Sequence, residues 1–147
     1  MGLFKMFKKK GAEAGAAIAR LENRDLVEAA IFGSIAVAYA DGNLEDAELE
    51  NLQLQIESND IFKGFPQVEI GQMIDKAVGL YKAGAILGKK KAMDQIRELA
   101  HDNDQAGEAF VAILTVAFAD GELEPAEEAL MDQIGKAMGG LKVKDFM

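Results

Sequence analysis

The chain of 147 residues contains no cysteine, one histidine and two prolines. The absence of cysteine excludes disulfides, thiolate metal sites and cysteine nucleophiles, and it is compatible with a reducing compartment. The single histidine, His101, cannot supply a histidine-based metal site or a catalytic pair. The serines are limited to Ser34 and Ser58, and no histidine is placed to activate either of them. Enzymes with a serine or cysteine nucleophile are therefore disfavoured.

Patterns typical of β-strands are also missing. No run alternates apolar and polar β-branched residues, and Pro66 and Pro125 stand where helices could begin. The apolar stretches at residues 29–40 and 109–119 reach only about twelve residues, too few to span a bilayer. The net charge of −9 argues against a nucleic-acid binder, which needs a basic surface. We therefore expect one compact all-α domain with two buried central helices.

Helical periodicity predicts the bounds of these elements. The central helices are expected at residues 25–40 and 105–119, approaching closely where small residues such as Gly33 stand. Amphipathic helices are expected around this pair, at residues 11–22, 45–58, 66–84, 89–101 and 125–138. Gly84 and Gly88 are expected to flank a helix–helix connection. The predicted product is a single helical bundle formed by residues 11–147.

One segment of the chain occurs twice, at a fixed offset of 79 residues. Residues 37–48 read VAYADGNLEDAE, and residues 116–127 read VAFADGELEPAE. Each copy joins an apolar helix to an acidic helix through an Asp-Gly turn. The match predicts an internal duplication with units at about residues 26–58 and 105–138. We expect the two halves to face one another across a pseudo-twofold axis.

Acidic residues are concentrated in both copies. Residues 41–57 and 120–132 hold six acidic residues each and no basic residue. Carboxylate oxygens favour Ca²⁺, Mg²⁺ or Mn²⁺ over zinc or copper. The predicted ligands of such a divalent cation are Asp41, Glu45, Glu48, Asp120, Glu124 and Glu127. Asp41 and Asp120 each follow the C-terminal turn of an apolar helix, where the helix dipole disfavours negative charge, so they are the hardest to explain structurally.

Two other interpretations apply to these residues. The spacing matches the second half of an EF-hand calcium loop, but apolar or aromatic residues take the first ligand positions, namely Val37, Tyr39, Val116 and Phe118. A complete EF-hand is thereby excluded, and a half-site pooling carboxylates from both copies stays open. A structural role is also open, because Pro125 suits the first helical position, Glu124 a cap and Glu127 the reciprocal capping-box position.

These features resemble the TerB-like family, which is named for tellurite resistance and whose module also occurs in a membrane-anchored DnaJ-like cochaperone. The resemblance rests on the Asp-Gly turn after an Ala/Val-rich helix, a Glu seven residues beyond the Asp, and the repetition of this unit, and it covers about residues 26–138. It implies an all-helical, non-enzymatic module in tellurite resistance, stress or phage defence, whose acidic residues bind a divalent metal or dock a partner. The positions carried over are Asp41, Glu48, Asp120 and Glu127. Glu45 and Glu124 depart from the family pattern, in which a small Ser or Asp is more usual.

Residues 1–10 form a separate, basic amphipathic segment. Residues 1–20 carry a charge balance of +4, which leaves −13 on the remainder. Its apolar and basic side chains follow the pattern of a helix lying on an anionic membrane surface, with Leu3, Phe4 and Phe7 among Lys5, Lys8, Lys9 and Lys10. Alternatively, the aromatic side chains cover a hydrophobic groove on the domain. No secretory signal is recognisable, so we expect a cytoplasmic protein with peripheral contact at the inner membrane.

The sequence thus predicts a non-enzymatic helical module that binds a divalent cation, a protein partner, or both, through its acidic residues. A metal-dependent hydrolase using the same carboxylates is the alternative, although no independent nucleophile, general base or phosphate loop is visible. A structural subunit of a larger assembly is the third interpretation. The run Lys89-Lys90-Lys91 is interpreted as a solvated helix start, with a docking patch for acidic partners as its alternative.

Overall fold

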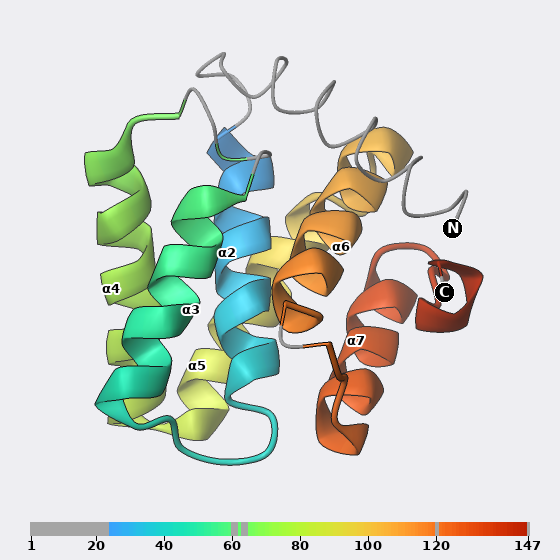
Figure 1. Cartoon of the computed structure of the whole chain (residues 1–147). Helices are drawn as coiled ribbons and strands as arrows, with labels where there is room; N and C mark the ends of the chain where they lie inside the picture. Colours follow the sequence, from blue (N-terminus) through green and yellow to red (C-terminus); the bar gives the residue numbers. More distant parts are fainter. Residues whose placement is uncertain (1–23, 60–61, 63–64, 120, 147) are drawn as a thin grey trace.

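The computed structural model describes residues 24–59, 62, 65–119 and 121–146. This described part consists of helices and connecting turns, without a strand (Figure 1). The elements are α2 (Arg24–Ala38), α3 (Asp46–Ser58), α4 (Gln67–Ala83), α5 (Ala85–Glu98), α6 (Asn103–Ala117), α7 (Pro125–Ala137) and the short 3-10 helix η3 (Val143–Phe146). The predicted all-α class is confirmed. None of the helices described here is long and apolar enough to cross a membrane.

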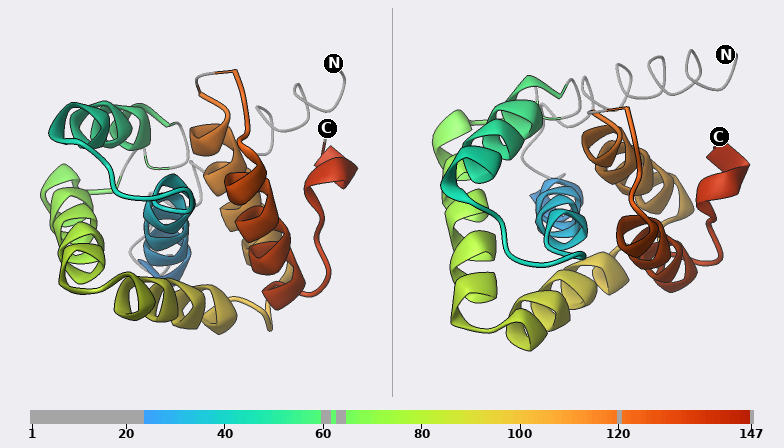
Figure 2. Two further views of the ribbon diagram at one scale, coloured as in Figure 1. Left: turned by 90° about the horizontal axis from the view of Figure 1, so that it is seen from below. Right: turned by 60° about the horizontal axis from the view of Figure 1, so that its bottom comes forward.

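Helix α2 lies at the centre of the bundle. Its sequence is apolar on every side, and eleven of its 15 residues are buried. Helices α6, α5 and α4 pack on it most extensively, and α7 adds a smaller contact, so that α2 is surrounded in both views of Figure 2. Ser34 is the polar residue of this buried stretch, and its hydroxyl donates to the Ala30 carbonyl oxygen at 2.7 Å. The prediction of a buried central helix is confirmed.

The closest approach of α2 to α6 depends on Gly33. A Cβ atom at this position would collide with the side chain of Ile113 on α6. The absence of a side chain therefore lets the two central helices pack closely, as predicted. Both helices end slightly earlier than expected, at Ala38 and Ala117, because the Asp-Gly turns begin there.

The prediction that Gly84 and Gly88 flank a helix–helix connection is wrong. Helix α5 begins at Ala85, directly after Gly84, and Gly88 lies inside its first turn. A Cβ atom at Gly88 would lie 2.5 to 2.8 Å from ring carbons of Tyr81. This glycine thus permits close contact between α4 and α5 and does not mark a turn. The helix predicted at residues 89–101 consequently starts earlier and ends at Glu98.

The C-terminal end of the chain folds back onto α7 and α6. Gly139 and Gly140 both adopt a φ of 102°, which ends α7 in the manner typical of glycine. The backbone N–H groups of Gly140 and Leu141 both donate to the Gly135 carbonyl oxygen, at 2.9 Å each. The ring of Phe146 then lies 5.2 Å from the ring of Phe110, between centroids. Helix η3 is thereby placed beside the second repeated segment.

Candidate functional site

The two repeated segments form the same local structure in their described residues. We call them the first corner (residues 39–48) and the second corner (residues 118–127, described apart from residue 120). The Gly42 N–H donates to the Tyr39 carbonyl oxygen at 3.1 Å, and the Gly121 N–H donates to that of Phe118 at 2.9 Å. Gly42 and Gly121 have φ values of 136° and 89°, a region that favours glycine. The predicted glycine turn is confirmed in both corners.

Each acidic helix begins with a glutamate capping box. The backbone N–H of Glu45 donates to Glu48 Oε1 at 3.0 Å, and that of Glu124 donates to Glu127 Oε1 at 2.9 Å. Pro125 stands at the start of α7, where its missing N–H costs nothing. The predicted capping roles of Glu124 and Glu127 are confirmed. One carboxylate oxygen of Glu48 and one of Glu127 are therefore committed to helix ends.

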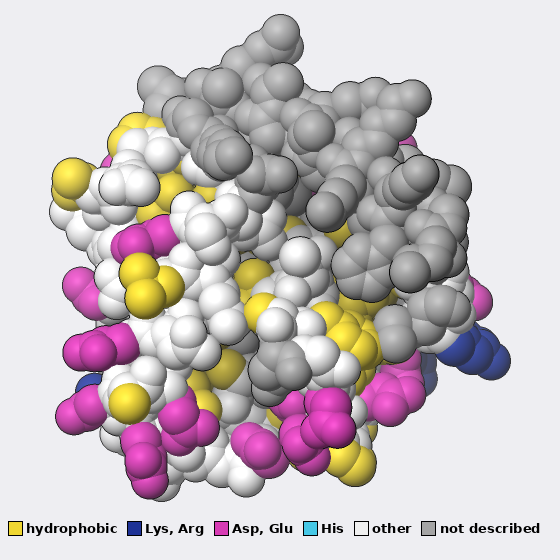
Figure 3. Space-filling view, viewed as in Figure 1, with side chains coloured by type: hydrophobic (Ala, Val, Ile, Leu, Met, Phe, Trp, Pro, Cys, Tyr) yellow, Lys and Arg dark blue, Asp and Glu magenta, His cyan; other side chains and the backbone are white. Residues whose placement is uncertain are grey.

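The predicted metal ligands are mostly exposed. Asp41, Glu45, Glu48 and Glu124 face solvent, Glu127 is half-buried, and Asp120 lies outside the described residues. Among the residues that are described, no three acidic or histidine side chains are grouped so that they could hold a metal ion. Figure 3 shows Asp and Glu side chains along the left and lower edges of this face, where α3, α4 and the loops before α3 and α7 lie in Figure 1. The described carboxylates thus form a dispersed acidic surface.

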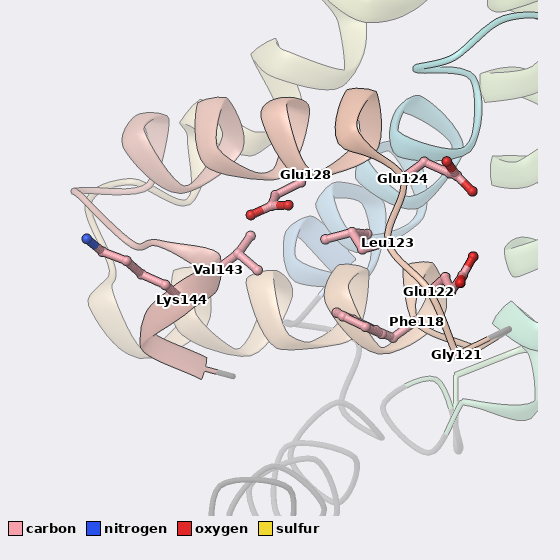
Figure 4. A pocket seen from close by; sticks show the side chains of 8 residues that line it. All are labelled: Phe118, Gly121, Glu122, Leu123, Glu124, Glu128, Val143 and Lys144. Atoms are coloured by element: carbon pink, nitrogen blue, oxygen red, sulfur yellow. The ribbon is translucent and has the colours of Figure 1, made fainter.

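A groove of about 530 Å³ opens beside the second corner. Its apolar lining comes from Phe118, Leu123 and Val143, and its charged lining is formed by Glu122, Glu124, Glu128 and Lys144. In Figure 4 the carboxylates of Glu122 and Glu124 point to the same side of the turn, whereas that of Glu128 lies on the other side, near Val143. An apolar floor with a mainly acidic rim suits a long basic side chain, whose aliphatic stem and charged end need different surroundings.

The groove was not predicted, because part of it comes from outside the repeat. Val143 and Lys144 belong to η3, which reaches the second corner only through the fold of the C-terminal segment. The sequence signal nearest to it is the pair of glycines at 139–140, which is typical of a helix end and indicates nothing about the return of the chain.

The first corner carries an aromatic stack. Tyr39, which corresponds to Phe118 of the second corner, stacks on Tyr81 of α4 with ring centroids 4.6 Å apart and planes 10° from parallel. Burial raises the pKa of Tyr81 to about 12, and the neighbouring Tyr39 adds to this rise. Burial also raises the pKa of Tyr39. Both phenols are therefore neutral at physiological pH, and the stack fastens the first corner to α4.

The predicted basic segment, with Leu3, Phe4, Phe7 and its four lysines, lies outside the described residues, so its membrane contact stays a prediction. A protein-family model described as "Tellurite resistance protein TerB" matches residues 27–146. This match covers both corners and the groove. No curated protein and no solved structure matches the chain.

Proposed function

Because the chain belongs to the TerB family of tellurite resistance proteins, we propose that it is a non-catalytic docking module in the response to tellurite or related stress. The proposed ligand is a basic segment of a partner protein, bound on the acidic surface of the two corners. The observation that carries the proposal is the groove at the second corner, with its apolar floor and mainly acidic rim. A lysine or arginine side chain would cover Phe118 and Leu123 with its stem and place its charge near Glu128, whose carboxylate lies on the same side of the turn as these apolar side chains.

The dispersed carboxylates favour docking over hydrolysis. A metal-dependent hydrolase needs carboxylates that converge on an ion and a group that activates water. The described carboxylates of the corners are mostly exposed and are not grouped in threes. Individual exposed ion pairs contribute only about 0–1 kcal/mol, so the affinity for a partner must come from several contacts together with the apolar floor. Long-range attraction would mainly accelerate association, and salt would slow it.

A divalent cation is a second candidate ligand, supported by the repeated Asp-to-Glu spacing. Asp41 and Asp120 follow the ends of α2 and α6, where the helix dipoles disfavour negative charge. We propose that Ca²⁺, Mg²⁺ or Mn²⁺ relieves this repulsion, with Asp41, Glu45, Glu48, Asp120, Glu124 and Glu127 as its ligands. The matching turns and capping boxes of the two corners support the accompanying proposal that the halves arose by duplication and are related by a pseudo-twofold axis.

Docking is tested with a synthetic peptide of alternating leucine and lysine, titrated into the full chain by calorimetry. We expect binding that weakens as salt rises and that the Glu128→Gln variant reduces. Glu50→Gln, an exposed carboxylate of α3, is the matched control. The same variants are then compared for growth of tellurite-challenged cells that depend on this chain. Full growth with a variant that no longer binds the peptide would contradict the proposed role of the groove.

Cation binding is tested separately by thermal unfolding at constant ionic strength. A cation that binds only the folded state stabilises it by about 2.7 kcal/mol at a hundredfold excess over its dissociation constant. We expect this stabilisation in the wild-type chain and its loss in the Asp41→Asn plus Asp120→Asn variant. Equal stabilisation of both proteins would show that general charge screening, and no specific ligation, is responsible.

A further inference from the structure

Residues 76–93 form a basic stretch in an otherwise acidic chain. They contain five lysines and no acidic residue, whereas the whole chain carries a net charge of −9. The stretch covers the second half of α4, Gly84 and the first part of α5. We call the junction of these two helices, residues 82–90, the basic corner. It lies at the periphery of the bundle in both views of Figure 2. Its charge is opposite to that of the first and second corners.

The basic corner exposes apolar side chains at its tip. Ile86 is 88% exposed and Leu87 is 49% exposed, and the neighbouring Ala83 and Ala85 also face solvent. The inner face of this turn is already occupied, because Gly88 packs on the ring of Tyr81. Ile86 and Leu87 are therefore left without a covering within the described bundle. Two adjacent large apolar residues at a projecting tip are typical of an interaction site.

Lysines flank this apolar tip on both sides. Lys82 lies in the last turn of α4, and Lys89 and Lys90 follow Leu87 in α5; all three are exposed. Lys90 also pairs with Asp94 at 2.9 Å, so part of its charge is neutralised. Lys91 is directed toward Gln95, which is buried. When the Gln95 amide is oriented so that both its oxygen and its nitrogen have partners, Lys91 Nζ donates to the amide oxygen at 3.2 Å. Lys82 and Lys89 are thus the main charges beside the tip.

We propose that the basic corner docks on an anionic lipid bilayer. Ile86 and Leu87 enter the interfacial layer of the bilayer, and Lys82, Lys89 and Lys90 face the lipid phosphates. Interfacial binding grows with the apolar area inserted and with attraction to anionic lipids, and the basic corner supplies both. A soluble polyanion would need the lysines but would have no use for exposed Ile86, and an acidic protein segment would have to supply an apolar pocket for this projecting side chain. The apolar tip is therefore what favours a bilayer over an acidic protein.

The first corner limits the strength of this contact. The Tyr39–Tyr81 stack places the first corner, which is acidic, near the C-terminal end of α4, where the basic corner begins. An anionic bilayer repels the carboxylates of the first corner, so we expect weak association that disappears as salt shortens the range of the attraction. Such a contact is reversible, as is usual for a single short apolar insertion.

A tryptophan reporter tests insertion directly, because the chain contains no tryptophan. The Ile86→Trp variant is mixed with phosphatidylcholine vesicles containing phosphatidylglycerol. We expect its emission to shift to shorter wavelength and to be quenched by a lipid-attached quencher. Val68→Trp is the matched control, since Val68 is 74% exposed but lies in the first turn of α4, at the opposite end of that helix. Equal responses of the two variants, or no response of Ile86→Trp, would overturn the proposal.

Co-sedimentation of the full chain with the same vesicles separates the basic corner from the predicted N-terminal contact. Ile86→Asp plus Leu87→Asp should lower the partition coefficient about tenfold, whereas Leu54→Asp plus Val68→Asp, two equally exposed sites elsewhere, should lower it much less. Lys82→Gln and Lys89→Gln should each lower it about fivefold. If residues 1–10 account for all binding, both aspartate pairs will behave alike and the proposal fails. Binding to polyglutamate that equals binding to vesicles would identify an acidic protein partner instead.

Discussion

Helices α3 and α7 follow the same turn and the same capping box but are fastened to the bundle very differently. Helix α3 buries only Leu52 and Ile56. Helix α7 buries Leu130, Met131, Ile134 and Gly135, and it packs on α2, α5, α6 and η3. The N–H of Val143 also donates to Asp132 of α7, at 3.3 Å. The repeated segment thus determines how each acidic helix begins, and the residues after it determine how firmly the helix is held.

This difference separates local from tertiary contributions to stability. A turn and a cap need only neighbouring residues, so the same twelve-residue segment produces them twice. How firmly a helix is held depends on the apolar residues of its inner face. The residues that follow position 48 in α3 differ from those that follow position 127 in α7. Burial contributes more than a cap does, by roughly 1.5–3 kcal/mol per large side chain against about 1 kcal/mol per cap.

The largest predicted effect is at Gly135, where α7 packs closely against the C-terminal segment. A Cβ atom there would collide with the backbone carbonyl of Leu141, and backbone atoms cannot move aside as a side-chain end can. We expect Gly135→Ala to lower the free energy of unfolding by about 3 kcal/mol, measured by urea denaturation. The control is Gly107→Ala in α6, where nothing lies within 4 Å of an added Cβ. That change should raise stability by about 0.5–1 kcal/mol. Similar losses of unfolding free energy in both variants would contradict the predicted steric collision at Gly135.

The next effect concerns local opening of the two acidic helices. Because α3 buries fewer residues than α7, it should open without unfolding of the whole bundle. We expect backbone amides of α3 to exchange with solvent deuterium at least about tenfold faster than those of α7, which corresponds to about 1.4 kcal/mol in opening free energy. Mass spectrometry of peptic fragments measures both helices in one experiment. Equal protection of the two helices from exchange would show that the capping box, which both helices share, determines their local stability more than the burial of apolar residues does.

A smaller effect is expected from the capping boxes themselves. Glu48→Ala and Glu127→Ala each remove the acceptor of a helix-end N–H and should each cost about 1 kcal/mol of unfolding free energy. Glu50→Ala, at an exposed position two residues further along α3, is the control and should have little effect. If Glu48→Ala and Glu50→Ala are equally mild, the hydrogen bond between Glu45 and Glu48 contributes nothing measurable. Exchange rates in the first turn of α3 would confirm that the loss is local.

The features that were predictable from sequence are the local ones. The all-round apolar character of α2 predicted its central position, and Asp-Gly followed by Glu and Pro predicted the turns and the start of α7. The error at Gly84–Gly88 has a tertiary cause. A glycine in a helix that must pack on a ring looks the same in sequence as a glycine that ends a helix, and only the position of Tyr81 distinguishes the two.

The candidate site was less predictable for the same reason. The predicted ligand set contained six of the eight acidic residues of the corners and left out Asp46 and Glu122, which lines the groove. The sequence also predicted the capping role of Glu127. Whether carboxylates converge depends on how α3 and α7 are set against the core, which the repeated segment does not encode. The groove required η3 to return beside Phe118, a contact between residues about 25 positions apart that rests on packing against Phe110.

The smallest predicted effect distinguishes the corners by titration, since the first corner has Tyr39 on Tyr81 and the second has Phe118 at the matching position. The Tyr81 phenol ionises near pH 10 in the unfolded chain, and its folded pKa is about 12. The buried neutral phenol contributes to the free energy of unfolding. This contribution is fully present below pH 10 and is lost as pH rises from about 10 to 12, because Tyr81 ionises readily in that window only in the unfolded chain. The comparison is made between variants that share every other ionisable group. We expect Tyr81→Phe to lose less unfolding free energy than the wild type between pH 9.5 and 11.5. The expected difference is about as large as the uncertainty of urea denaturation, or slightly larger.

The Tyr39→Phe variant, which copies the second corner, should reduce the pH dependence of the unfolding free energy by a smaller amount. Identical slopes in the wild type and Tyr81→Phe would mean that burial beside Tyr39 does not raise the pKa of the Tyr81 phenol.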